Sequence, residues 1–176
     1  MPNGSFVTRR SELERYFDHS ASDAWKALTS DAPVSGIRAT VRAGRDRMRD
    51  TLLSWLPEDL RGRRVLDAGC GTGALSVELA RRGASVVAVD LAPTLLEVAR
   101  ERLPSDVPGD AIEFRSGDML EESLGHFDHV VAMDSLIHYE GPDVVEALGR
   151  LVPRVKGSVL FTFAPRTPAL ALMHAT

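Results

Sequence analysis

Short apolar segments alternate with segments of helical periodicity from about residue 63 onward. The apolar segments predict buried strands over 64–67, 85–90, 112–114, 129–133 and 158–163. The segments between them predict amphipathic helices over 75–82, 94–103 and 144–151. This alternation predicts an α/β domain, in which helices cover both faces of a parallel sheet.

The first 60 residues have a purely helical pattern. Ser11 and Glu14 form a Ser-x-x-Glu sequence, which predicts a capping box at the start of a helix. The apolar positions of this helical region are Leu13, Phe17, Trp25 and Leu28. A second, long amphipathic helix is predicted from apolar residues that recur every three, four or seven positions, at Val34, Ile37, Val41, Met48, Leu52 and Trp55. We therefore predict a helical cap over residues 1–60 and a Rossmann-like core over residues 61–176.

The composition suits one globular domain. The chain has 176 residues, of which 44% are hydrophobic and 26% charged, and its formal net charge is −4. A negative net charge gives no general attraction to nucleic acid. We expect neither a signal peptide nor a transmembrane segment, because no apolar run has the required length. Cys70 is the one cysteine, so no internal disulfide can form, and we expect a cytoplasmic protein.

A glycine-rich loop follows the first predicted strand. The sequence Asp67-Ala-Gly-Cys-Gly-Thr-Gly73 joins this strand to the next predicted helix, as in sites that bind nucleotide-like ligands at the carboxyl edge of a sheet. Glycine lets the backbone approach a ligand closely and adopt unusual dihedral angles. Gly69, Gly71 and Ala74 also satisfy the dinucleotide pattern G-x-G-x-x-A, so the loop alone does not identify the ligand.

Three features favour S-adenosylmethionine over a dinucleotide. Asp67 precedes Gly69 by two residues, where a carboxylate can hold the cationic amino group of the methionine part but repels a pyrophosphate. A third glycine, Gly73, makes the pattern G-x-G-x-G. Asp118 and Met119 follow the third predicted strand, where the adenine amino group needs an acceptor and its ring needs an apolar cover.

The end of the second predicted strand offers a further contact. Asp90 can accept hydrogen bonds from both ribose hydroxyls, as it can in NAD enzymes, so it does not separate the two ligands. Leu91 is expected beside it in the cofactor site. Cys70 is also counted with the cofactor loop, as a small packing residue and not as a nucleophile. The alternative interpretation is that Asp67 and Asp90 are simple strand-end carboxylates around a bare turn.

The loop resembles motif I of class I methyltransferases, and other segments carry a narrower resemblance. The sequences Leu13-Glu-Arg-Tyr-Phe17, Val41-Arg-Ala-Gly-Arg-Asp46, Val131-Ala-Met-Asp-Ser-Leu-Ile-His-Tyr139 and Phe161-Thr-Phe-Ala-Pro165, together with Trp25, are similar to the magnesium-protoporphyrin IX O-methyltransferase family, in particular its bacteriochlorophyll-pathway form. The resemblance runs from about Ser11 to Pro168.

The resemblance implies a fold and a reaction. The fold is a Rossmann-like class I methyltransferase sheet with an N-terminal helical lid, and the reaction methylates one propionate carboxylate of magnesium protoporphyrin IX with S-adenosylmethionine. It also implies contact with the porphyrin-binding subunit of magnesium chelatase and, through the pathway, a place at the photosynthetic membrane. The chain is shorter than the family pattern, so we expect the C-terminal antiparallel strands to be missing.

The resemblance also suggests residues that contact the substrate. His138 and Tyr16 are the candidates for contacting the propionate or the porphyrin. Met133 and Asp134 are expected at the methionine end of the cofactor, although Asp134 can instead cap the following turn. The histidines have no metal-ligand spacing, so we expect no protein-bound metal, and the magnesium belongs to the substrate.

Basic residues form the polar side of the long N-terminal helix, at Arg38, Arg42, Arg45 and Arg49. They can attract a second propionate or an acidic partner, but a solvated helix face is the favoured interpretation.

Three other functions remain open. A methyltransferase with another small-molecule acceptor conflicts only with the N-terminal and His138 segments. An NAD-binding oxidoreductase is disfavoured by Asp67 and Gly73. A non-catalytic module that binds the cofactor or a partner is compatible with the short C-terminus.

Overall fold

Five parallel strands form one sheet in the order β3-β2-β1-β4-β5. The computed structural model describes residues 4–16 and 36–163. The strands are β1 (Arg64–Ala68), β2 (Ser85–Asp90), β3 (Ile112–Ser116), β4 (Phe127–Ala132) and β5 (Val155–Phe161). The predicted α/β, Rossmann-like class is therefore confirmed.

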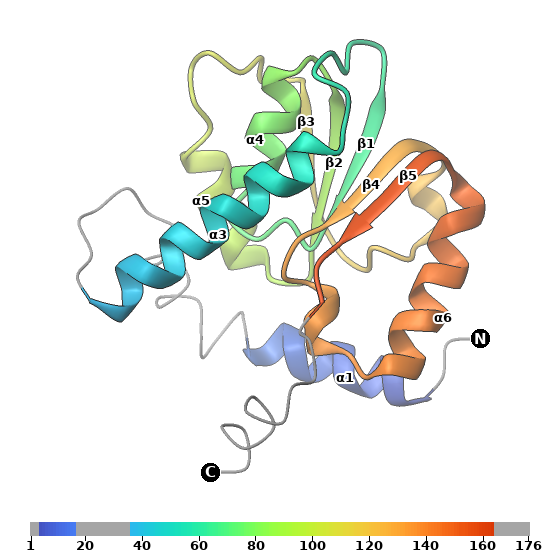
Figure 1. Cartoon of the computed structure of the whole chain (residues 1–176). Coiled ribbons are helices and arrows are strands. Elements are labelled where there is room, and N and C mark those ends of the chain that lie inside the picture. The colour runs from blue at the N-terminus through green and yellow to red at the C-terminus, as the bar shows by residue number, and fades with distance from the viewer. Residues whose placement is uncertain (1–3, 17–35, 164–176) are drawn as a thin grey trace.

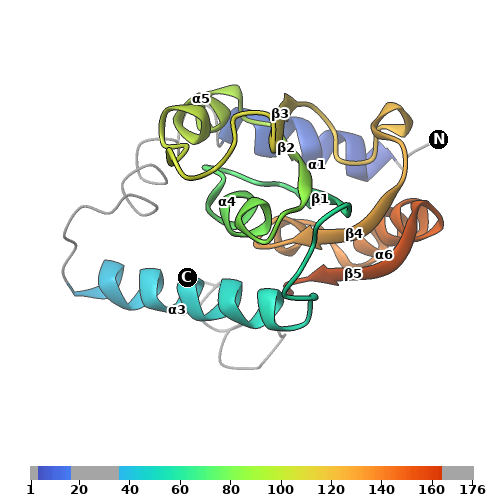
Figure 2. The same cartoon turned by 90° about the horizontal axis from the view of Figure 1, so that it is seen from above.

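Helices cover both faces of the sheet. One face carries α3 (Ile37–Ser54), α4 (Ala74–Arg81) and α5 (Pro93–Glu101), and the other carries α6 (Gly141–Leu151) (Figures 1 and 2). Short 3-10 helices, η2 (Glu122–Leu124), η3 (Leu136–His138) and η4 (Val152–Arg154), occur in the connections. The three helices predicted between the strands have bounds within three residues of those observed.

The strands are apolar along their length because both faces of the sheet are covered. Residues 65–68 of β1 are all buried, as are residues 86–89 of β2. On one face Leu52 and Leu79 pack with Val86 and their neighbours. On the other face Phe127, which is 2% exposed, packs with Leu151 and the end of α6. These two clusters hold the sheet between its helical layers.

The strand order places a crevice at the end of β1. From β1 the chain proceeds to β2 and β3 on one side, and later to β4 and β5 on the other. The connections that leave β1 and β4 therefore diverge at their carboxyl ends, where open parallel sheets bind their ligands. The helix α1 (Gly4–Arg15) lies below this edge in Figure 1, far in sequence from the strands that it approaches.

Two features of the N-terminal region differ from prediction. Ser11 lies inside α1 and not at its start, and its hydroxyl donates to the Val7 carbonyl oxygen at 3.2 Å. This bond to the preceding turn satisfies the hydroxyl without a cap. Trp55 is the C-cap of α3 and is 65% exposed, while Leu53 and Leu56 are buried in its place. The predicted contacts of Phe17, Trp25, Leu28 and Val34 lie outside the described residues.

The sheet has β5 at one edge. Within residues 36–163, β5 pairs only with β4, and no antiparallel strand lies beside it. In the same described part of the chain, no helix combines the length and the apolar character needed to cross a bilayer.

A pair of helical valines tests the packing of α5 against the sheet. Val98 in α5 is 8% exposed and Val145 in α6 is 71% exposed. We expect Val98→Ala to lower the free energy of unfolding by about 1–2 kcal/mol, because two buried methyl groups are lost. Val145→Ala gains the same helix propensity and should change it by less than about 0.5 kcal/mol. Urea unfolding measures both, and equal effects would contradict this packing.

Candidate active site

The loop between β1 and α4 is held against β2 by its backbone. The N–H groups of Gly69 and Cys70 donate to the Val89 carbonyl oxygen at 2.8 and 3.0 Å. Gly69 has a φ of 81°, and a Cβ added there would lie 2.3 Å from the Cβ of Ser135. The Ser135 hydroxyl in turn donates to the Ala68 carbonyl oxygen at 2.7 Å. Glycine at position 69 is therefore required by the close approach of the segment after β4.

A buried carboxylate stands directly before this loop. The side chain of Asp67 is 1% exposed, and one of its oxygens accepts a 2.6 Å hydrogen bond from the Ser76 hydroxyl. Burial raises the pKa of Asp67 to about 7, an effect that the Ser76 hydrogen bond opposes and the nearby Asp90 reinforces. A carboxyl group in this state favours a cationic partner, because a positive charge stabilises its ionised form.

The second carboxylate ends β2 and is held by two backbone groups. One oxygen of Asp90 accepts from the Gly71 N–H at 2.7 Å and the other from the Ala92 N–H at 2.9 Å. Burial nevertheless raises the pKa of Asp90 above its usual value. The Leu91 N–H also contributes, but a carboxylate has about four acceptor positions, so Asp90 can still accept from a ligand.

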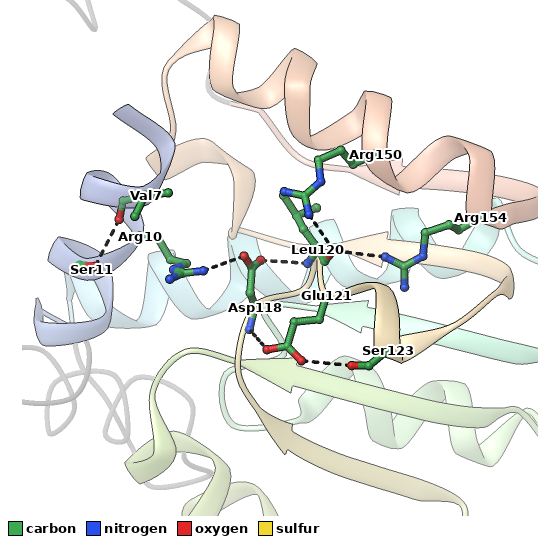
Figure 3. A network of polar contacts seen from close by, with 9 residues as sticks. All are labelled: Val7, Arg10, Ser11, Asp118, Leu120, Glu121, Ser123, Arg150 and Arg154. Carbon is green, nitrogen blue, oxygen red and sulfur yellow. Dashed lines mark hydrogen bonds and ion pairs between the residues drawn. The ribbon is translucent and has the colours of Figure 1, made fainter. Parts of the chain in front are cut away.

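The segment after β3 is joined to the N-terminal helix. Asp118 accepts a 2.9 Å hydrogen bond from the Leu120 N–H, and its other oxygen forms a 2.9 Å ion pair with Arg10 of α1 (Figure 3). The Leu120 carbonyl oxygen accepts from Arg150 and Arg154, on the opposite side of the segment. This network ties α1, α6 and η4 to one loop.

The segment after β4 contains the most unusual backbone. Asp134 is the one non-glycine residue with a positive φ, 57°, within residues 4–16 and 36–163. Its N–H donates to the Thr162 hydroxyl at 2.7 Å, and its carboxylate forms an ion pair with Arg45 of α3. Such backbone strain persists only where the surroundings fix it, and it is common at functional sites.

His138 lies a few residues further on, at the end of η3. Its carbonyl oxygen accepts a 2.9 Å hydrogen bond from Arg9 of α1. Burial lowers the pKa of the His138 ring, and the nearby Arg9 lowers it further, while Asp134 acts in the opposite direction. The lowered pKa favours the neutral form of the ring, which also makes a hydrogen bond to the Asp134 backbone.

These segments surround one cavity of about 380 Å³. Its wall contains the glycine loop, the ends of β2 and β4, and one face of α3. Of the residues predicted to bind cofactor or substrate, those that line it are Asp67, Gly69, Cys70, Gly71, Asp90, Leu91, Asp118, Met119, Met133, Asp134 and His138. The fold thus gathers residues that are up to 71 positions apart, from 67 to 138, around one space.

Two predicted site residues do not line the cavity. A Cβ at Gly73 would lie 3.2 Å from the Cβ of Ala99 and 3.3 Å from the Phe114 ring. Gly73 therefore lets α4 begin close to α5 and β3, which is a packing role. Tyr16 follows α1 and is 53% exposed, away from the cavity wall.

Sequence reasoning missed several residues of the wall. Tyr139 lines the cavity beside His138, and burial raises its pKa to about 12. Leu13, which is 7% exposed, covers the cavity from α1. Three arginines of α3, for which a solvated face was the favoured expectation, also line it: Arg42, Arg45 and Arg49. Their spacing of three and four residues was the available signal.

Cys70 is a packing residue of the loop. Burial raises the pKa of its thiol well above the usual value, and the two neighbouring carboxylates raise it further. A thiol in this state is a poor nucleophile. Among the residues that the structure describes, no group of three His, Cys, Asp or Glu side chains is placed to hold a metal ion.

Comparison with known proteins shows which class of protein has this fold and cavity. Residues 65–157 match the model of the methyltransferase domain family. The sheet order and the cavity at its carboxyl edge agree with that class.

Individual relatives are more specific. The chain is 53% identical to magnesium-protoporphyrin O-methyltransferase of Rhodobacter capsulatus over 97% of this chain and 75% of the relative. The crystal structure of magnesium protoporphyrin IX methyltransferase from Synechocystis PCC 6803 with bound SAH matches with a TM-score of 0.84 and 27% identity, over 94% of this chain and 76% of that one. A ubiquinone biosynthesis O-methyltransferase of Xanthomonas oryzae is 43% identical over 95% of this chain and 65% of the relative. The chain belongs to the magnesium-protoporphyrin O-methyltransferase family.

Two glycines test the packing of the loop. Gly69→Ala places a methyl group against Ser135 in a backbone conformation that alanine rarely adopts. We expect it to lower the free energy of unfolding by about 2–4 kcal/mol. Gly44→Ala, inside α3 with nothing within 4 Å of the added atom, should raise it by about 0.5–1 kcal/mol. Urea denaturation compares the two variants, and a neutral Gly69→Ala would show that Ser135 does not approach the loop this closely.

Proposed function

We propose that the protein methylates one propionate carboxylate of magnesium protoporphyrin IX, with S-adenosylmethionine as the methyl donor, in (bacterio)chlorophyll synthesis. The observation that supports this most strongly is the cavity itself. Its wall combines a buried carboxylate, a glycine loop and a second strand-end carboxylate with basic and imidazole side chains. Two relatives of this chain are magnesium-protoporphyrin O-methyltransferases, which supports magnesium protoporphyrin as the methyl acceptor.

The residues present fit S-adenosylmethionine. Asp67 offers a buried carboxyl group for the cationic amino group, and Asp90 keeps free acceptor positions for the ribose hydroxyls. Asp118 and Met119 offer an acceptor and an apolar surface for adenine. When bound, the donor supplies an electrophilic methyl group on a sulfonium sulfur.

The protein has little acid–base work to do in this reaction. A propionic acid has a pKa near that of Glu, about 4.3, so the attacking carboxylate is already ionised at pH 7. His138 lines the cavity wall, where its ring can contact the substrate beside this carboxylate. Most of the acceleration then comes from alignment of the reactants and from exclusion of water by the cavity walls. Tyr16 is exposed and does not line the cavity, so we propose substrate contact for His138.

The helix α1 acts as a lid in this proposal. It contacts the core through Arg10 on Asp118, Arg9 on the His138 carbonyl oxygen, and Leu13 in the cavity wall. These contacts join the predicted adenine and porphyrin sides of the site. A segment that closes over both ligands excludes water and completes the site, and it must open to release product.

Two wider associations rest on the family resemblance alone. They are contact with the porphyrin-binding subunit of magnesium chelatase and a place at the surface of the photosynthetic membrane. An apolar macrocycle gains from direct transfer between proteins or from a nearby membrane, because free porphyrin exposes a large apolar surface to water.

The proposal is tested by incubating the protein with methyl-labelled S-adenosylmethionine and magnesium protoporphyrin IX. We expect label in a base-labile ester of the porphyrin, because the acceptor is a carboxylate. Calorimetry with S-adenosylhomocysteine and with NAD, run in parallel, should show binding of the first only. Binding of S-adenosylhomocysteine without porphyrin labelling would favour another acceptor or a non-catalytic module. Binding of NAD alone would contradict the proposal entirely.

A matched pair of arginines tests the lid. We expect Arg10→Gln to raise the KM for S-adenosylmethionine on the order of fivefold, because a partly buried ion pair that holds α1 over Asp118 is lost. Arg15→Gln removes the same charge from the same helix, but its Nε bonds only to the Ser11 carbonyl oxygen. The control should leave the KM unchanged. Steady-state kinetics decide the point, and equal KM values for both variants would exclude a role for the Arg10 contact.

A further inference from the structure

The helix α3 presents charged side chains to the cavity at a regular spacing. Arg42, Arg45, Asp46 and Arg49 all line the cavity wall. Residues three, four and seven positions apart lie on the same side of a helix, so these four form one face. The face carries three positive charges and one negative charge, which makes it the basic wall of the cavity.

The three arginines of this face have different surroundings. Arg45 forms an ion pair with Asp134, so α3 is fixed beside the segment that ends in His138. Arg49 pairs with Asp46 at 3.0 Å, and the Asp46 side chain is 47% exposed. An exposed ion pair of this kind is weak and can be exchanged for a ligand. Arg49 thus sits in the wall with a partner that a stronger anion can replace.

Arg49 also has an unused donor. Its Nε atom is buried and has no hydrogen-bond partner, a property shared only with Arg154 Nη2 among the side-chain atoms of the described residues. The Arg49 side chain as a whole is 25% exposed. A buried donor without a partner destabilises the protein unless a ligand completes it. Guanidinium groups bind carboxylates and phosphates best, because their donors match two oxygens at once.

The substrate that the proposed function names brings two carboxylates to the site. The propionates of protoporphyrin IX stand on adjacent rings, at one edge of the macrocycle, so one cannot approach the methyl donor while the other stays far away. Only one of them becomes an ester in the proposed reaction. The other carboxylate leaves water as well, and a desolvated carboxylate needs a cation or hydrogen-bond donors.

We propose that the basic face of α3 binds the propionate that is not methylated, with Arg49 as its principal contact and Arg42 beside it. This inference rests on the proposed function and adds a specificity determinant to it. We call the propionate that is not methylated the spectator carboxylate. When it is bound to α3, the other propionate is the one directed toward the methyl donor. Arg45 is a positioning residue, because its pair with Asp134 sets the place of α3 relative to His138.

Two porphyrin esters test the proposal directly. The monomethyl ester formed by the reaction keeps only the spectator carboxylate, and the dimethyl ester keeps none. We expect the unmodified protein to bind the magnesium monomethyl ester about tenfold more tightly than the magnesium dimethyl ester, measured by fluorescence quenching. Arg49→Gln should reduce this ratio to about one. Arg49→Lys keeps the charge but lacks the paired donors of a guanidinium group, so it should retain part of the ratio.

The control is Arg47→Gln, which removes a charge from the same helix. Arg47 is exposed and does not line the cavity, and its side chain bonds to the Ala43 carbonyl oxygen of its own helix. It should leave the ratio near tenfold. Calorimetry with S-adenosylhomocysteine, expected to be unchanged in every variant, shows that each remains folded.

Each outcome bears on the inference. A ratio that falls in Arg49→Gln but not in Arg47→Gln supports it, as does formation of the isomeric monoester by the Arg49 variant. A ratio near one in the unmodified protein overturns it while leaving the proposed reaction intact, and so does an unchanged ratio in Arg49→Gln. Failure of the unmodified protein to methylate any porphyrin overturns the proposed function and this inference with it.

Discussion

The burial of one carboxyl group at the end of β1 determines the character of the site. Asp67 is enclosed by the sheet and by the start of α4, with a single hydroxyl as its side-chain partner. Keeping a carboxylate out of water costs free energy, which is why its pKa is raised to about 7. A cationic ligand group recovers that cost. In the glycine loop beside it, the protein backbone can come close to a ligand. The second carboxylate, Asp90, holds this loop in place through the Gly71 N–H.

Two ion pairs connect the N-terminal region to this site. Arg10 of α1 pairs with Asp118, and Arg45 of α3 pairs with Asp134. Each joins a basic residue from the first part of the chain to an acidic residue that follows a strand of the sheet. The cap is therefore part of the cavity wall and not an appendage. The cavity wall thus combines loops of the core with α3 and the segment after β4.

Sequence reasoning predicted the fold well and the wall of the cavity in part. Strand and helix positions followed from periodicity, because a sheet covered on both faces demands continuous apolar strands. The glycine loop and its carboxylates were found because parallel strands end at one edge. Gly73 does not line the cavity, and spacing alone cannot separate a packing glycine from a binding one. The arginines of α3 were assigned to solvent because amphipathicity shows that a face is polar, but not what lies opposite it.

The central claim is that the Asp67 carboxyl group is partly protonated in the free protein and becomes ionised when a cationic ligand binds. The most direct measurement is an NMR titration of protein labelled with ¹³C at the aspartate carboxyl carbons, with Asp67 assigned by comparison with Asp67→Asn. The account predicts a pKa of about 7 for Asp67 in the free protein. Saturation with S-adenosylhomocysteine should lower this pKa by at least about one unit, because the ligand's ammonium group stabilises the carboxylate. A pKa near 4 in the free protein, or one that does not fall when the ligand binds, would contradict the account.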